Sequence, residues 1–209
     1  MNERLITQQT WDTLADWYEN NFLDEPLYHF SYDLLCERLV TKNSQILELG
    51  CGPGNISKYL LSKRPDFKIT CTDYSDNMLR LVKKNCPNVS VKKMDINALA
   101  SIEQQFHGIV AGFCLPYLSM PEVETFLRHA TDKLLPGGQL YISFIVGDYE
   151  KSGLKTNSSG QQALQYYYSV EYLREKLIDL SFKKLAVLPM THLRAGKKPE
   201  QQNVLIASR

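Results

Sequence analysis

The chain has 209 residues, 44% of which are hydrophobic, and its formal net charge at pH 7 is +1. This composition is that of a globular protein and excludes a disordered chain, and the length suits one domain with a full hydrophobic core. The near-neutral charge gives no strong signal for binding nucleic acid or an anionic membrane surface.

Membrane and metal signals are both weak. No apolar run approaches the roughly 18 residues of a membrane-spanning helix, and the polar, amphipathic N-terminus does not have the pattern of a secretory signal. The cysteines occur singly, and their odd number and spacing argue against a disulfide framework or a zinc site. They are Cys36, Cys51, Cys71, Cys86 and Cys114. We therefore predict a reduced, cytoplasmic protein with no membrane segment and no metal site.

The first part of the chain has a helical pattern over residues 7–40, without strand-like segments. From residue 45 onward, short apolar strands alternate with amphipathic helices. The expected strands are Gln45–Leu49, Phe67–Asp73, Val89–Lys93, Phe106–Gly112 and Gln139–Ile145. The expected helices are Asn55–Ser62, Asp76–Asn85, Pro121–Leu134 and Val170–Leu180. Leu-Pro-Gly-Gly is a strong signal for the end of the third of these helices.

Two segments follow the fifth strand. Gly147–Ser169 is a polar insert that lies outside the alternation, and it contains three consecutive tyrosines at 166–168. Lys184–Leu188 and Asn203–Ala207 are expected to pair as closing strands, separated by a polar turn around Gly196–Glu200.

The alternation predicts an α/β fold, a doubly wound, mostly parallel sheet of seven strands with helices on both faces. We expect one domain, in which residues 1–43 form a helical cap and residues 44–146 form the core. Residues 147–209 would add the insert, the last helix and the closing strands. Sheets of this kind bind ligands beyond the carboxyl ends of their strands, so the N-terminal helices and the insert are expected to cap a site there.

The segment QILELGCGPGN, residues 45–55, places three glycines between a strand and a helix. Glycine lets the backbone approach a ligand closely, whereas a plain turn does not need three of them. The third glycine comes one residue too early for the dinucleotide pattern G-x-G-x-x-G. No lysine follows it, as a Walker-type phosphate loop would require. The loop therefore indicates a different ligand.

LELGCGPGN resembles the first motif of the class I S-adenosylmethionine-dependent methyltransferases. Four later segments resemble the other motifs of this family in order and spacing up to about residue 145: TDYSDNML, KMDINAL, FHGIVAGFCLPYLS and LLPGGQLYISF. TWDTLADWYENN is similar to the helix that precedes this domain in small-molecule methyltransferases. The resemblance implies a Rossmann-like methyltransferase fold and S-adenosyl-L-methionine as the methyl donor.

The resemblance also implies roles for three acids. Glu48 would organise the glycine loop near the ammonium group of the ligand, Asp73 would bind the ribose, and Asp95 the adenine amine. Asp73 follows Gly54 by 19 residues, which fits the ribose role, although it could instead cap the next helix. Asp95 could likewise be a turn residue. The full predicted set is Tyr18, Glu48, Gly50, Cys51, Gly52, Gly54, Asp73, Tyr74, Met78, Asp95, Ile96 and Phe113.

The segment FCLPY, Phe113–Tyr117, bears on the acceptor. Methyltransferases that act on the amide nitrogens of proteins or on nucleic-acid nitrogens resemble one another here in the motif Asp/Asn/Ser-Pro-Pro-aromatic. This segment lacks the acid or amide and the first proline of that motif. Cys114 is misplaced for the nucleophile of cytosine-carbon enzymes, and we expect it to be a buried apolar residue. Tyr117, at a pocket wall, and His29, as a base, are weak catalytic candidates. One of the three tyrosines at 166–168 is expected on the core, and another could reach the pocket.

These observations predict an enzyme that transfers a methyl group to a small molecule by direct in-line displacement. Positioning and water exclusion can drive such a step, and a general base is needed only if the nucleophile must lose a proton. One alternative is an RNA or protein methyltransferase that uses lysines to contact phosphates. Those lysines are Lys83, Lys84, Lys92, Lys93, Lys197 and Lys198. Another alternative is a non-catalytic S-adenosylmethionine-binding module. The acceptor and the oligomeric state stay open.

Overall fold

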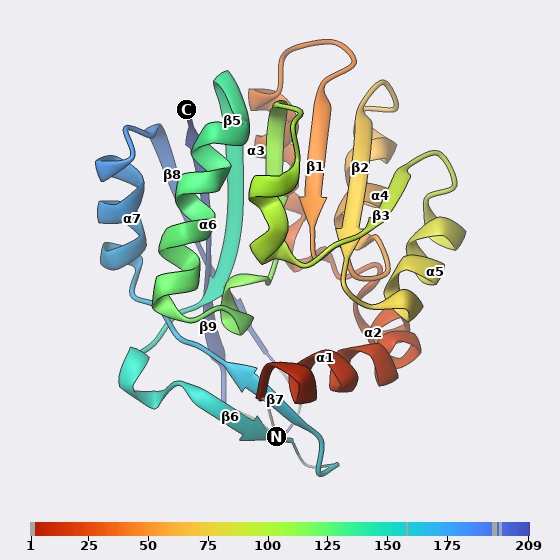
Figure 1. The fold of residues 1–209 in the computed structure, drawn as a ribbon, viewed down its shortest axis with the longest axis vertical. Helices are drawn as coiled ribbons and strands as arrows, with labels where there is room; N and C mark the ends of the chain where they lie inside the picture. Colours follow the sequence, from red (N-terminus) through yellow and green to blue (C-terminus); the bar gives the residue numbers. More distant parts are fainter. Residues whose placement is uncertain (1–2, 158, 194–195, 197) are drawn as a thin grey trace.

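The computed structural model describes residues 3–157, 159–193, 196 and 198–209. A seven-stranded sheet with the order β3-β2-β1-β4-β5-β9-β8 forms its centre (Figure 1). β1 to β5 pair in parallel, whereas β9 is antiparallel to β5 and β8. The strands are β1 (Gln45–Leu49), β2 (Lys68–Asp73), β3 (Ser90–Lys93), β4 (Phe106–Ala111), β5 (Leu134–Ile145), β8 (Lys183–His192) and β9 (Glu200–Ser208). The predicted doubly wound, mostly parallel seven-stranded sheet is confirmed.

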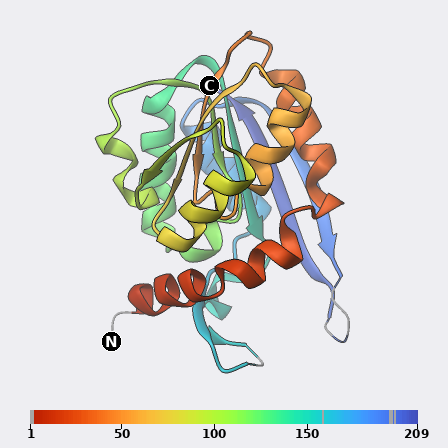
Figure 2. The same ribbon diagram turned by 90° about the vertical axis from the view of Figure 1, so that its right-hand side faces the viewer.

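Helices cover both faces of the sheet (Figure 2), because central parallel strands are apolar on both sides and must be buried on both. One core cluster joins the sheet to α3, α4 and α5, and a second joins the opposite face to α6 and α7. These helices are α3 (His29–Arg38), α4 (Asn55–Lys63), α5 (Asp76–Asn85), α6 (Met120–Lys133) and α7 (Val170–Asp179).

The winding of the chain reverses between β1 and β4. From β1 the chain moves outward through β2 to β3, and it then returns to place β4 on the other side of β1. The loops that leave β1 and β4 therefore diverge at the carboxyl edge of the sheet. A crevice at such a reversal point is where open α/β sheets bind ligands.

The N-terminal helices and the insert form one cap over this edge. α1 (Glu3–Thr13), α2 (Ala15–Phe22) and the 3-10 helix η1 (Pro26–Tyr28) run along it (Figure 2). The insert folds into an antiparallel pair, β6 (Gly153–Thr156) and β7 (Gln162–Gln165). β7 lies against α1, since Leu164 N donates to Thr7 Oγ1 at 2.8 Å and Thr10 Oγ1 donates to the Gln162 carbonyl at 2.7 Å. Three further 3-10 helices are η2 (Ile96–Ser101), η3 (Leu115–Tyr117) and η4 (Tyr149–Lys151).

The element boundaries differ from the prediction mainly around β5. Leu-Pro-Gly-Gly was expected to separate a helix from a strand that begins at Gln139. The strand begins at Leu134 instead, because Leu134 already pairs with Phe106 on β4 before the register shifts. Gly137, with a φ of 78°, lies in this irregular stretch. β8 and β9 are also longer than predicted, so Glu200 begins β9 rather than ending a turn. Lys197 of the predicted turn lies outside the described residues.

Within the described part of the chain, no helix is both long and apolar enough to cross a membrane. The five cysteines are buried and their thiols are free. The His, Cys, Asp and Glu side chains of the same part form no group of three that could hold a metal ion.

Candidate functional site

The glycines of the loop after β1 make room for different neighbours. φ is positive at both Gly52 (53°) and Gly54 (92°). A Cβ at Gly54 would lie 2.7 Å from Cγ2 of Val82, so this glycine lets the start of α4 pack against α5. A Cβ at Gly52 would instead enter the space bounded by Tyr18 and Met78, at 3.9 and 4.0 Å. Gly52 is therefore the glycine that leaves room for a ligand.

A cavity lies beside this loop, between the carboxyl ends of the strands and the cap. It is lined by every predicted cofactor residue except Gly54, and by Tyr117. The predicted residues are Tyr18, Glu48, Gly50, Cys51, Gly52, Asp73, Tyr74, Met78, Asp95, Ile96 and Phe113. The lining residues that sequence reasoning missed are Arg4, Thr7, Gln8, Trp11, Asn55, Ile56, Met94, Gly112, Cys114, Leu118 and Leu164.

Asp73 ends β2 and ties the glycine loop to the start of α5. Its Oδ2 accepts from the Gly52 N–H at 3.0 Å and its Oδ1 from the Ser75 N–H at 2.9 Å. Burial raises the pKa of Asp73 to about 6. The cap of α5 is Ser75, whose hydroxyl accepts from the Met78 N–H at 3.0 Å, so Asp73 is not the helix cap. Its carboxylate faces the cavity in a position to accept further hydrogen bonds.

Glu48, on β1, is part of the floor of the cavity. Its carboxylate accepts a hydrogen bond from the Ser57 hydroxyl, and the Cys71 thiol lies 3.9 Å from Oε2. Burial raises the pKa of Glu48 to about 7, although the bond from Ser57 lowers it. A buried carboxyl with a pKa near neutrality becomes more acidic when a cation binds beside it.

Asp95 joins the end of β3 to the cap. Both of its oxygens accept from Nη2 of Arg4, at 2.7 and 2.9 Å, and Oδ2 also accepts from Gln8 at 3.2 Å. The Asn97 N–H donates to Oδ1 at 2.9 Å, which makes Asp95 the cap of η2. Arg4 also binds Glu122. Asp95 is thus a turn residue that lines the cavity as well.

The missed residues of α1 share one helical face. Arg4, Thr7, Gln8 and Trp11 follow the spacing i, i+3, i+4, i+7, and this spacing was the signal that could have revealed them. The Trp11 ring lies 5.8 Å from Tyr18 and 5.6 Å from Tyr117, measured between ring centroids. Trp11 Nε1 is buried and has no hydrogen-bond partner among the described residues. A buried donor of this kind favours a ligand that brings an acceptor atom.

Phe113 follows β4 with a backbone conformation that is unusual for a side chain of its size. Its φ is 54°, and its N–H donates to the Ser143 hydroxyl at 2.7 Å. Such left-handed residues cost on the order of 1–3 kcal/mol and cluster at functional sites. The conformation brings the Phe113 ring to the cavity, 5.2 Å from the Tyr28 ring.

The structure does not bring His29 to the cavity. The His29 ring stacks on Tyr59 of α4 with 4.2 Å between centroids, and His29 is not among the residues that line the cavity. Position 29 was singled out because it lies in the N-terminal region. The cap, however, is made by α1, α2, η1 and the insert, whereas His29 begins α3, which packs on a face of the sheet. His29 is therefore withdrawn as a candidate base.

The remaining aromatic and thiol candidates have packing roles. Burial raises the pKa of Tyr117 well above 10, which makes it a wall of the cavity rather than a base. The Cys114 thiol donates to the Leu49 carbonyl at 3.0 Å and is buried. Tyr168 packs in the core and donates to the Leu118 carbonyl. Neither Tyr166 nor Tyr167 lines the cavity, so the expectation that one tyrosine of this run reaches it is not supported.

Residues 46–138 match a family model described as a methyltransferase domain. Malonyl-[acyl-carrier protein] O-methyltransferase of Priestia megaterium is 29% identical over 181 residues, which cover 80% of this chain and 62% of that protein. Trans-aconitate 2-methyltransferase of an Azoarcus species is 31% identical over 133 residues, which cover 64% of this chain and 50% of that protein. The chain thus spans less than two thirds of the length of these curated relatives.

A crystal structure of 1,6-didemethyltoxoflavin-N1-methyltransferase from Burkholderia thailandensis has the same fold. It contains 1,6-didemethyltoxoflavin and S-adenosylhomocysteine, and it superposes with a TM-score of 0.72 at 17% identity, over 98% of this chain and 88% of that one. Residues 46–138 therefore match a methyltransferase domain, and the solved structure shows that the fold accommodates S-adenosylhomocysteine in another enzyme. The chain as a whole has the class I methyltransferase fold, as its five motifs predicted.

The cavity fits S-adenosylmethionine in its chemistry. Glu48, Asp73 and Asp95 present carboxylates toward a ligand that carries an ammonium group, ribose hydroxyls and an exocyclic amine. Gly52 leaves space at the loop, and Trp11 Nε1 offers a donor that lacks a partner among the described residues. The role of each residue toward the ligand stays a prediction.

Proposed function

We propose that the protein transfers a methyl group from S-adenosylmethionine to a small-molecule acceptor. The observation that carries the proposal is the cavity itself, which joins Gly52, Glu48 and Asp73 at the reversal point of the sheet and is closed by α1 and β7. Two of the curated relatives act on malonyl-[acyl-carrier protein] and trans-aconitate, as their names state.

S-adenosylmethionine supplies a methyl group on a positively charged sulfur. The protein binds and orients the reactants and excludes water from them. The glycine loop and Glu48 would hold the methionine part, Asp73 the ribose, and Asp95 with Ile96 the adenine. Tyr18 on α2 and Phe113 and Tyr117 after β4 also line the cavity, and we assign to them the wall that positions the acceptor, which replaces the cofactor contact predicted for Tyr18 and Phe113. Positioning and water exclusion can contribute roughly 7–11 kcal/mol to a transfer of this kind.

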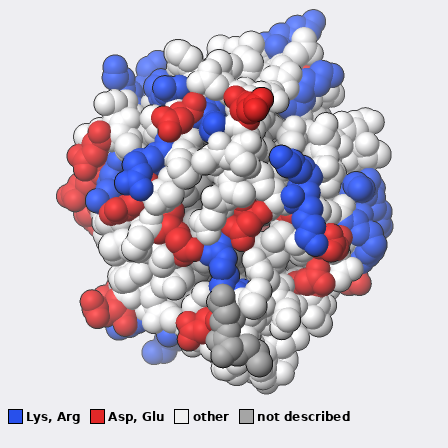
Figure 3. All heavy atoms as spheres, viewed as in Figure 1, with Lys and Arg blue, Asp and Glu red and all other residues white. Residues whose placement is uncertain are grey.

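The charge distribution favours a small acceptor over RNA. Lys84 pairs with Glu19 at 3.3 Å, and Lys93 with Asp76 at 2.5 Å, so these lysines already have acidic partners. On the face shown in Figure 3, basic and acidic side chains are interspersed. This face, with both signs mixed, lacks the basic stripe that a phosphate backbone selects. Lys197 of the predicted lysine set lies outside the described residues.

Calorimetric titration of S-adenosylmethionine and S-adenosylhomocysteine into the protein tests the donor half of the proposal. We expect micromolar binding that is lost in Asp73→Ala and kept in Asp132→Ala, an exposed residue of α6 that controls for removing a carboxylate. Absence of binding to the folded wild type would refute the proposal and would favour a scaffold that has lost the ligand.

The acceptor half is tested with methyl-labelled S-adenosylmethionine and separate pools of metabolites, RNA and protein. Label in the metabolite pool that depends on Asp73 is the expected result. Label only in RNA, with a steep dependence on salt, would instead establish the nucleic-acid alternative. Binding without label in any pool would support the non-catalytic module.

A further inference from the structure

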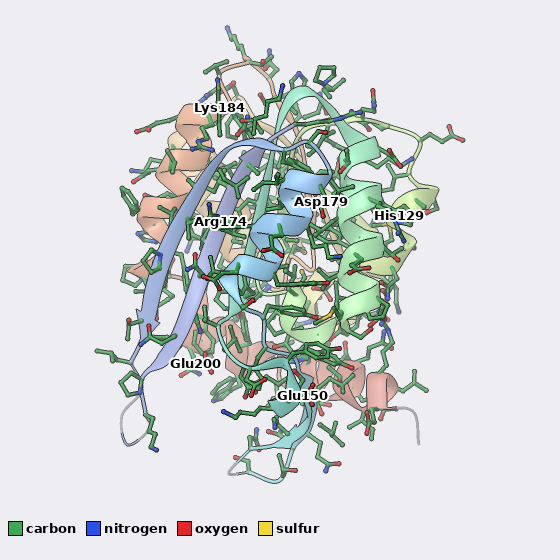
Figure 4. The ribbon with its side chains drawn as sticks, turned by 90° about the vertical axis from the view of Figure 1, so that its left-hand side faces the viewer. His129, Glu150, Arg174, Asp179, Lys184 and Glu200 are labelled. Atoms are coloured by element: carbon green, nitrogen blue, oxygen red, sulfur yellow. The ribbon has the colours of Figure 1, made fainter. Side chains whose placement is uncertain are left out.

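The two ends of the sheet differ in the chemistry that they bring to the carboxyl edge. β2 and β3, on one side of the glycine loop, end in the cavity residues Asp73 and Asp95. On the other side, antiparallel β9 starts at this same edge, since Gln202 pairs with Ile145 at the end of β5. Glu200, the first residue of β9, is therefore a carboxylate at this edge on the side away from the predicted nucleoside site, outside the lining of the cavity. Figure 4 shows it at the lower end of β9.

A hydrogen-bond chain, buried at its Tyr28 end and part-buried at Glu200, connects Glu200 to a ring that packs against the cavity wall. Gln202 Nε2 donates to Glu200 Oε1 at 2.5 Å, and the Tyr28 hydroxyl donates to Gln202 Oε1. Tyr28 and Gln202 are buried, and the Tyr28 ring contacts Phe113, which lines the cavity. This chain fixes the Glu200 carboxylate in place, because a buried, paired glutamine cannot rotate freely.

Aromatic rings continue from the cavity toward the start of β9. The Tyr18 ring lies 4.8 Å from Phe22, and Phe22 lies 6.2 Å from the ring of His192, which is opposite Glu200 in the β8–β9 register. We name as the aromatic wall the set Tyr18, Phe22, Tyr28 and Phe113. Tyr18 and Phe113 line the cavity, whereas Phe22 and Tyr28 pack against their rings. Aromatic faces attract ammonium groups and exclude water, and a fixed carboxylate adds charge attraction.

The charges argue against an anionic acceptor. Arg4 is the basic side chain among the described residues that line the cavity, and it is held by Asp95 and Glu122 on the β3 side. A carboxylate acceptor at the aromatic wall would face Glu200 and would have no cation beside it within that lining. Burying like charges together is costly, whereas an amine would be attracted.

We propose that the methyl acceptor is an amine on an apolar or aromatic group, held between the aromatic wall and the Glu200 carboxylate. The inference rests on the proposed methyltransferase function and narrows its acceptor. It separates this chain from the relatives named for malonyl-[acyl-carrier protein] and trans-aconitate.

In the proposed step, Glu200 first holds the ammonium ion of the acceptor and then accepts a proton from it. The amine arrives as an ammonium ion and gives one N–H proton to the Glu200 carboxylate, which passes it to solvent. The freed nitrogen lone pair then forms the bond to the methyl carbon. The carbon–sulfur bond breaks and its electron pair stays on sulfur, so that the sulfonium becomes a neutral thioether and the product a methylated ammonium. One proton is released for each methyl group transferred.

The first measurement compares three ligands of the same shape, 2-phenylethylamine, 2-phenylethanol and 3-phenylpropanoate, by calorimetry on the complex with S-adenosylhomocysteine. We expect the amine to bind at least tenfold more tightly than the alcohol and the carboxylate. Equal or weaker binding of the amine, including no binding at all, overturns the inference. Binding of S-adenosylhomocysteine itself reports separately on the proposed function.

The second measurement uses Glu200→Gln, with the exposed Glu150→Gln as the matched control (Figure 4). In Glu200→Gln the preference for the amine over the alcohol should disappear, while the Kd for S-adenosylhomocysteine changes less than twofold. The pH dependence of amine methylation, measured as kcat and KM separately, should also change. The control should keep the wild-type preference, and an unchanged preference in Glu200→Gln would rule out its proposed contact with the amine.

Discussion

Gly52 and Gly54 show how two residues of one motif can serve different ends. Position 54 is closed to a side chain by Val82 at 2.7 Å, and position 52 faces the space beside Tyr18 and Met78. A motif match alone assigns both glycines to the ligand. Only the packing around each glycine separates a requirement of the fold from a requirement of the site.

Alanine should therefore mainly lower the stability of the fold at position 54 and mainly weaken ligand binding at position 52. Gly54→Ala should lower the free energy of unfolding by about 1–3 kcal/mol through steric overlap and backbone strain. Gly52→Ala should cost about 1–2 kcal/mol for its positive φ but should weaken S-adenosylmethionine binding at least tenfold. Urea unfolding and calorimetry measure the two quantities. Wild-type affinity in Gly52→Ala would contradict its placement beside the ligand.

Glu48 should make stability depend on pH. Burial raises its pKa to about 7 from an ordinary value of 4.5, so the folded state holds a proton that the unfolded state has released. The stabilisation from this proton is complete below pH 4.5 and is lost as the pH rises to 7. Asp73, with its pKa raised to about 6, acts in the same direction.

The free energy of unfolding should accordingly fall between pH 5 and pH 7.5, and it should fall less in Glu48→Gln, which keeps the Asp73 contribution. Urea unfolding at the two pH values measures this. Equal slopes for the variant and the wild type would show that Glu48 titrates normally in the fold.

Hydrogen bonds hold α1 to β7 within the cap and to Asp95 on the core. Thr7 on α1 and Leu164 on β7 share a buried hydrogen bond of 2.8 Å, and Arg4 binds Asp95 on the core. Both contacts sit over the cavity. The stability of the cap and the release of the ligand are therefore expected to be linked.

Thr7→Val keeps the side-chain shape but leaves the Leu164 N–H without its acceptor. We expect a loss of about 1–3 kcal/mol in the local stability of α1 and β7, with faster amide exchange there and faster ligand dissociation. Thr131→Val, near the end of α6, is the control, since the Thr131 hydroxyl donates to the Leu127 carbonyl of the same helix. Unchanged exchange in the cap of Thr7→Val would show that other contacts hold it.

At the scale of the whole molecule, a ligand bound between the core and the cap should stabilise both. At a concentration 100 times its Kd, a ligand adds about 2.7 kcal/mol to the free energy of unfolding. For a domain of this size that raises Tm by roughly 5–11 °C. Differential scanning calorimetry with S-adenosylhomocysteine should show this shift for the wild type and not for Asp73→Ala. A single transition that moves as a whole would show that cap and core unfold together.

The sheet and the loop side of the cavity could be predicted from the sequence, because each depends on residues that are close together in the chain. Glu48, Gly52, Asp73 and Asp95 all follow strand ends, and their motifs are local in the chain. The start of β5 could not be read in this way, because the pairing of Leu134 with Phe106 overrides the helix-stop signal.

The residues on the cap side of the cavity could not be predicted from local sequence either, because they depend on contacts between distant parts of the chain. Trp11 and Thr7 reach the site only because α1 folds back on Tyr117 and on β7, contacts that join distant parts of the chain. β6 and β7 are short, polar strands, whose sequence gives no alternation to detect. His29 was misplaced because helical spacing says that α3 exists but not which layer it joins.

The antiparallel start of β9 places the two halves of the site in separate stretches of the gene. Residues that face the predicted donor site follow β1, β2 and β3, whereas Glu200 and His192 belong to the terminal hairpin. If Glu200 holds the acceptor as proposed, mutations in that hairpin should change what is methylated without touching the donor site. Exchanging the hairpin between relatives would then be a direct route to new acceptors while the donor chemistry stays constant.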